Sequence, residues 1–276
     1  MMKVRSRSTP LFCVLLMSLT FYSFTTAAET TPLLSVGVIE FDAGIPADLS
    51  SHRRLGIYPL IRKAEARYFP YLLRQTLAQS QQWGVVRVMP DDYQSAELLI
   101  RGKILRSDGL DLQVAIKVVD SAGRVWIDKN YQARAQTNLE TPSMDKEIFA
   151  SLYRRISDDM LAYRAQLSKV ALNALPVLTK LRYGAEILPE YFSEYLALDE
   201  LGLKLVKRMP ALNDPMLARI ERMQAYEYLF VDTADEQYQN TQEDMRKAYN
   251  LWRQFSREQI LYIEDYQRRS AKKQSD

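Results

Sequence analysis

The sequence is poor in the side chains that most enzyme and metal sites use. Its 276 residues include one cysteine, Cys13, and one histidine, His52. A zinc site needs several cysteine or histidine ligands, and Ser-His-Asp or Cys-His catalysis needs a histidine placed beside its nucleophile. His52 lies in the polar stretch 50–54, where we expect an exposed loop histidine. The sequence therefore predicts no metal site, no cofactor and no catalytic residue.

Glycine is also scarce, and its spacing does not fit the common phosphate-binding loops. The nine glycines stand singly, in neither the Rossmann nor the P-loop spacing. The sequence thus carries no signal for a nucleotide cofactor.

Residues 1–28 have the order of a secretory signal. Three basic residues precede an almost wholly apolar run at 11–24, and small residues follow it. We expect cleavage near Ala27 or Ala28 and a periplasmic protein, with an uncleaved N-terminal anchor as the alternative. The residues before Cys13 are not the small ones of a lipoprotein signal, so we expect no lipid anchor.

The mature chain is expected to be electrically neutral. Removing residues 1–28 takes three basic and no acidic residues from totals of 37 and 34, which leaves 34 of each sign. A neutral chain has no global electrostatic reason to bind nucleic acid or an anionic membrane surface. We therefore expect an envelope protein as partner, no nucleic acid, and no membrane insertion after signal cleavage.

The clearest structural pattern is a three-stranded β-meander at residues 96–133. Apolar and polar residues alternate through 110–118, which is typical of a strand with one face on a core. Turn residues at 107–109 and 120–123 separate this strand from similar runs on either side.

A strand, a helix and a second strand precede the meander. The β-branched run at 33–41 predicts a buried strand, residues 57–84 have helical spacing, and residues 85–88 predict the second strand. Pro70 lies inside the helical stretch, so we expect a kink or two shorter helices there. With the meander, these elements predict an α/β domain with a mixed sheet at 29–140.

Several of these segments carry a family resemblance. The runs LLSVGVIEF, SAELLIRGKIL and VAIKVVDSAGRVWIDKNY resemble the small α/β domain at the N-terminus of the translocation protein TolB. Similar domains occur in lipoprotein activators of penicillin-binding proteins and in the curli secretion pore subunit. The resemblance covers about residues 33–165 and implies an adaptor-type domain. This sequence has no lipidated cysteine and no propeller after the domain, so the partners of those families are not carried over.

Residues 141–276 have helix-type sequence and predict an all-helical C-terminal domain. We expect helices at about 144–165 and 167–188, the second bent at Pro176, and a third from 189 to 203.

Two capping signals mark the last third of the chain. Asp214, followed by proline, is expected to start a helix after a linker at 209–213. The apolar face of this helix is expected to include Leu217, Ile220, Met223, Tyr226 and Phe230. Thr233 and Glu236 match a capping box that would start another, longer helix, which frays over 268–276. The whole chain is therefore predicted to be α+β.

Asp232, Asp235 and Glu236 form the densest acidic group, and glycosidases use a pair of carboxylates. A carbohydrate- or peptidoglycan-active enzyme is therefore the alternative function. Helix capping by Thr233 and Glu236 explains the same residues more simply, because acidic side chains stabilise helix N-termini.

Aromatic residues are abundant, with 17 tyrosines in the chain. Tyrosine and tryptophan bury a large apolar area while keeping a polar tip, which suits protein interfaces. The predicted partner-binding residues are Arg67, Tyr68, Tyr71, Trp126, Tyr249 and Trp252. Together these features favour a non-enzymatic cell-envelope accessory or adaptor protein that acts by protein contact.

Overall fold

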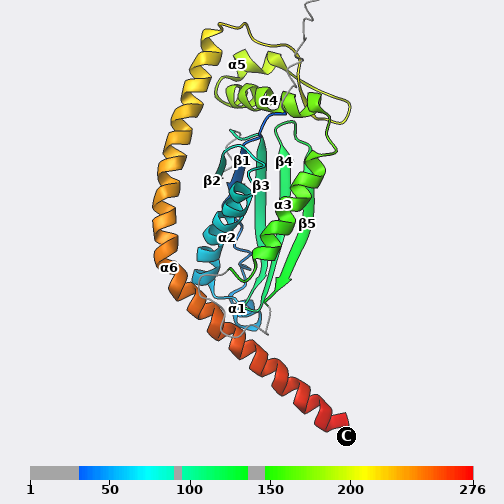
Figure 1. Cartoon of the computed structure of the whole chain (residues 1–276), viewed down its shortest axis with the longest axis vertical. Coiled ribbons are helices and arrows are strands. Elements are labelled where there is room, and N and C mark those ends of the chain that lie inside the picture. The colour runs from blue at the N-terminus through cyan, green and yellow to red at the C-terminus, as the bar shows by residue number, and fades with distance from the viewer. Residues whose placement is uncertain (1–30, 90–94, 136–146, 276) are drawn as a thin grey trace, which may run out of the picture. The chain divides into compact units, whose positions relative to one another are not determined.

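The computed structural model describes residues 31–89, 95–135 and 147–275. The fold is α+β, as predicted (Figure 1), and residues from Thr31 onward group into one unit. The predicted signal at 1–28 and the predicted domain boundary between residues 140 and 141 lie outside the described residues.

The first half contains the five strands of the main sheet with two helices after the first strand, and helices dominate the second half. In chain order they are β1 (Val36–Ile39), α1 (Leu49–Arg54), α2 (Pro59–Gln79), β2 (Val86–Met89), β3 (Leu98–Ser107), β4 (Asp111–Asp120), β5 (Val125–Arg134), α3 (Ala150–Arg164), α4 (Lys169–Ile187), α5 (Pro189–Phe192), the 3-10 turn η1 (Ser193–Tyr195), β6 (Leu196–Leu198), β7 (Lys204–Val206) and α6 (Pro215–Ser275).

The first five strands form one mixed sheet in the order β2-β1-β3-β4-β5. Strand β1 runs parallel to both neighbours, whereas β3, β4 and β5 are antiparallel. The predicted meander is thereby confirmed. Its two tight turns contain Gly109 and Gly123, whose φ angles of 85° and 90° are accessible to glycine without strain.

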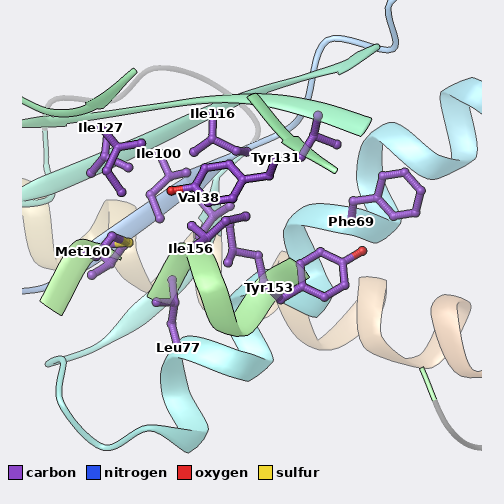
Figure 2. Packing of buried hydrophobic residues seen from close by; sticks show 14 of the residues in the cluster. Val38, Phe69, Leu77, Ile100, Ile116, Ile127, Tyr131, Tyr153, Ile156 and Met160 are labelled. Atoms are coloured by element: carbon purple, nitrogen blue, oxygen red, sulfur yellow. The ribbon is translucent and has the colours of Figure 1, made fainter. Parts of the chain in front are cut away.

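Helices α2 and α3 cover one face of this sheet (Figure 1). Figure 2 shows Val38, Ile100 and Ile116 of the strands packed with Phe69 of α2 and Tyr153 of α3. The alternation predicted for β4 explains this arrangement, because its even-numbered residues from 112 to 118 all face the core and are buried. The same core also includes residues of α3 and α4, so both predicted domains contribute to it.

Helices α2 and α4 run continuously through Pro70 and Pro176, so the alternative of two shorter helices at Pro70 is wrong. A proline inside a helix costs about 3 kcal/mol through the lost backbone hydrogen bond and a clash. In α2, Phe69 and Leu73 on either side of Pro70 are fully buried. Their packing in the core helps to offset the cost of the proline within the helix.

The predicted helix over 189–203 is also wrong after its first turns. The chain forms only α5 and η1 there and then the hairpin of β6 and β7. A side-chain oxygen of Asp199 accepts hydrogen bonds from the amides of Leu201 and Leu203, and Gly202 has a φ of 77°. This turn chemistry favours a hairpin over a helix.

Helix α6 is a single helix of 61 residues. Asp214 caps its start as predicted, since its Oδ1 accepts from the amides of Met216 and Leu217. The predicted second start at Thr233 is wrong, because that hydroxyl donates to the carbonyl of Leu229 one turn earlier in the same helix. The helix also continues through residues 268–275, where we expected fraying. No helix within the described ranges is both long enough and apolar enough to span a membrane.

Candidate functional site

A buried polar cluster joins the distal half of α6 to α2 and β3. Glu65 of α2 is 1% exposed, and its Oε1 accepts hydrogen bonds from the hydroxyls of Ser107 (2.6 Å) and Tyr249 (2.7 Å). Its other oxygen lies 3.3 Å from the Nε of Arg62. Burial raises the pKa of Glu65, although both hydroxyl groups and the nearby guanidinium groups of Arg253 and Arg62 act in the opposite direction.

Arg253 is the second buried member of this cluster. It is 3% exposed, and its guanidinium lies 3.3 Å from the Glu147 carboxylate and 4.5 Å from the ring centre of Phe149. The ring of Tyr249 is 5.0 Å away. This arginine therefore connects α6 to the residues that lead into α3.

Two ion pairs hold the proximal half of α6. Asp232 accepts two hydrogen bonds from Arg87 of β2, at 2.6 and 3.0 Å, and Arg87 also lies over the ring of Tyr228. Asp235 is 2.7 Å from Arg74 of α2. The densest acidic group of the sequence thus contains two anchors that attach α6 to the α/β layer.

Asp235 and Glu236 should differ sharply when replaced, because only the first is buried. We expect Asp235→Ala to lower the free energy of unfolding by about 1–3 kcal/mol, since it removes the carboxylate paired with Arg74. Glu236→Ala should change it by less than about 0.5 kcal/mol. Urea unfolding of both variants measures this, and equal losses would show that Asp235 is not an anchor.

Four of the six predicted partner-binding residues meet between α2 and α6. Tyr68 lies 5.2 Å from Tyr249, which stacks on Trp252 at 5.8 Å, and Tyr71 lies one turn further along α2. Tyr68 and Tyr71 are at most 9% exposed, and burial raises the pKa of Tyr68 to about 12. In this structure the two tyrosines of α2 pack inside the molecule.

The other two predicted residues lie apart from this group. Arg67 is exposed and pairs with Glu40 at 3.1 Å. Trp126 is in the core, 5% exposed, and its indole Nε1 donates to Asp120 at 2.9 Å. The predicted loop histidine, His52, lies in α1, and its half-buried ring is 2.7 Å from the carbonyl oxygen of Pro46.

A small cavity of about 130 Å³ lies between α2 and α6. It is lined by Tyr68, Tyr71, Leu72, Gln75, Glu147, Glu243, Arg246 and Asn250. Within the described ranges, no group of three or more histidine, cysteine or acidic side chains is arranged to hold a metal ion.

An exposed apolar surface on α6, which we name the proximal patch, was not predicted from the sequence. It consists of Met223, Tyr226, Leu229 and Phe230, which are 38%, 73%, 64% and 70% exposed. Met223, Tyr226 and Phe230 were expected on the same core face as Ile220, but of these four residues only Ile220 is buried. The exposed residues and Ile220 all fit helical spacing, so spacing alone does not tell which side of the helix faces the core.

Comparison with known proteins assigns no family to the chain. No family model matches it, and no curated protein matches it. Among solved structures, it is similar to a dodecamer of a PelC variant from Paraburkholderia phytofirmans, with a TM-score of 0.29 and 14% sequence identity. That match covers 48% of this chain and 93% of the PelC chain. A likeness at this TM-score supports no conclusion about fold or function.

Proposed function

We propose that this chain is a non-enzymatic accessory protein of the cell envelope, exported to the periplasm, that binds another envelope protein through the proximal patch of α6. The observation that carries the proposal is the exposure of Tyr226 and Phe230, at 73% and 70%, beside Leu229. Large exposed aromatic side chains that cluster on one surface are typical of protein-binding sites.

The patch forms one continuous surface because of its spacing. At 100° per residue, Met223, Tyr226 and Phe230 fall within about 60° of one another around the helix. The side of the helix that faces the α/β layer carries Ile220 and Val231 instead, both 2% exposed. The two aromatic rings are therefore directed away from the core.

The anchors of α6 support the proposal by holding the patch in place. Arg87 and Arg74 pair with Asp232 and Asp235 on the next turns of the helix, and the Gln224 side chain donates to the Ser95 carbonyl at 3.1 Å. A surface that is already ordered loses less conformational entropy when a partner binds. These pairings also give the acidic group a structural role, in keeping with a non-enzymatic protein.

Replacing Tyr226 and Phe230 with serine should strongly weaken partner binding without unfolding the protein. Truncation of aromatic anchors at an interface typically costs about 2 kcal/mol or more, so we expect recovery of the partner to fall roughly 30-fold. The measurement is crosslinking in intact cells, followed by affinity recovery of the tagged chain. Circular dichroism should show unchanged helix content, because both side chains are exposed.

Leu212→Ser is the matched control, because Leu212 is a fully exposed apolar residue outside α6. It should recover the same partner as the unmodified chain. Recovery of identical proteins from all variants would refute binding through the proximal patch. Hydrolysis of peptidoglycan by the purified chain, lost in Asp235→Asn or Glu236→Gln, would refute a non-enzymatic role.

A further inference from the structure

A second exposed apolar surface surrounds α1 and the start of α2. Four large apolar side chains within twelve residues are exposed: Leu49 (78%), Leu55 (56%), Tyr58 (58%) and Leu60 (83%). Scattered exposed leucines are ordinary on a protein surface, whereas several large apolar side chains exposed in one short segment are a feature of interaction sites.

Helix α6 adds its own residues to this surface. The ring of Tyr58 meets that of Trp252 edge to face at 6.4 Å. On the neighbouring positions of α6, Leu251 and Phe255 are 43% and 57% exposed. We name the combined set, from Leu49 to Leu60 and from Leu251 to Phe255, the α1 surface.

The α1 surface is held in one conformation by its backbone. Ile57 is buried, and its amide donates to the carbonyl of His52 at 2.8 Å. Gly56 before it has a φ of 63°, which turns the chain between α1 and α2 and leaves Leu55 and Tyr58 outside. The exposed side chains are thus presented by an ordered turn.

The charges of this segment all have one sign. Residues 49–64 include four basic residues and no acidic residue, although the mature chain is expected to be neutral overall. The acidic residue just before them, Asp48, is exposed and caps α1, with its carboxylate accepting from the Ser50 amide at 3.0 Å. Within the segment, Arg62 is buried beside Glu65 and Lys63 is exposed.

We propose that the α1 surface binds the surface of a membrane that contains anionic phospholipid. Leucine and phenylalanine side chains enter the boundary between headgroups and acyl chains, where tyrosine and tryptophan rings also settle. Basic residues of the same segment are attracted to anionic headgroups, so the binding should depend on both lipid charge and salt. This is peripheral binding, separate from the expected signal and from the proximal patch that carries the proposed function.

The test is binding of the chain from Thr31 onward, which forms a compact unit, to vesicles. Sedimentation is measured with vesicles of pure phosphatidylcholine and with vesicles containing one-third phosphatidylglycerol. We expect binding to the anionic vesicles to be roughly tenfold stronger or more, and to weaken as salt is added. Equal binding to both vesicles, or no binding to either, overturns the proposal.

Substitutions then identify the surface. Leu55→Ser with Leu60→Ser should reduce binding to anionic vesicles by roughly tenfold or more, whereas the control Leu212→Ser should not. Unchanged vesicle binding of the double variant overturns the proposal. It is overturned equally if the double variant still binds vesicles but no longer crosslinks to an envelope protein in cells, because the surface would then bind a protein. A failure here leaves the proximal patch untouched, because Tyr226→Ser and Phe230→Ser are measured separately.

Tryptophan fluorescence gives an independent readout of the same event. Trp83 and Trp126 are each 5% exposed in the core, whereas Trp252 is half-buried at the α1 surface. Brominated anionic lipids should therefore quench the chain, and Trp252→Phe should remove most of that quenching. Quenching that persists in Trp252→Phe would place the contact elsewhere and overturn the proposal.

Discussion

Replacing Glu65 with alanine is expected to lower the free energy of unfolding by about 3–5 kcal/mol. The buried carboxylate accepts hydrogen bonds from Ser107 of β3 and Tyr249 of α6 and pairs with Arg62 of α2. Its removal leaves two hydroxyl groups without their acceptor and a buried guanidinium without its carboxylate. Urea unfolding followed by circular dichroism measures the loss.

Glu65→Gln is the matched control, because it keeps an acceptor oxygen of similar shape but removes the charge. Burial raises the folded pKa of Glu65 above its ordinary value of 4.5, against the opposing effects of Ser107, Tyr249, Arg253 and Arg62. The stability contributed by such a group is complete below the unfolded pKa and is lost as pH rises through the folded pKa. The unmodified chain should therefore gain stability relative to Glu65→Gln as pH falls from neutrality towards 4.5, the ordinary pKa of a glutamate side chain. If the difference in free energy of unfolding between the unmodified chain and Glu65→Gln did not change with pH, or moved against the unmodified chain in acid, the result would contradict a raised pKa.

Replacing Trp126 with alanine is expected to lower the free energy of unfolding by about 3–5 kcal/mol. Its ring stacks on Tyr163 at 5.3 Å and lies 6.4 Å from Trp83, so the substitution opens a cavity among aromatic side chains. The substitution also removes the indole N–H that donates a hydrogen bond to Asp120. Asp120 in turn accepts a hydrogen bond from the Arg124 amide at 2.9 Å in the turn between β4 and β5.

The matched control for this prediction is Trp252→Ala, which removes a half-buried ring from α6. Trp252→Ala should lower the free energy of unfolding by less than roughly half as much as Trp126→Ala, because the half-buried ring buries less apolar area in the folded protein. Urea unfolding of the two variants under the same conditions makes the comparison. Equal losses would show that Trp126 does not have the structural role described above.

The sheet could be predicted from the sequence because its signals are local. The alternation at 110–118 and the turns around Gly109 and Gly123 each specify one strand or one reversal. The hairpin of β6 and β7 was missed because strands of three residues are too short to show an alternation.

The candidate site depended on contacts that no local pattern contains. Arg87 and Asp232 are 145 residues apart in the chain, so their pairing follows only from the path of α6. The same packing decided that Ile220 is buried and Phe230 is exposed, although both fit one helical periodicity. Among the aromatic residues, side-chain type indicates which ones suit an interface, but it does not distinguish the core residue Trp126 from a surface residue.

The most direct test of the proposed function is site-specific photo-crosslinking in intact cells, with two positions on α6 and one outside it. A photoreactive amino acid is placed singly at Tyr226, Phe230 and, as the control, Leu212. Binding through the proximal patch predicts that the first two positions crosslink to the same envelope protein and that Leu212 does not. Crosslinking to that protein from Leu212 with equal yield, or none from Tyr226 and Phe230, would contradict binding through the proximal patch.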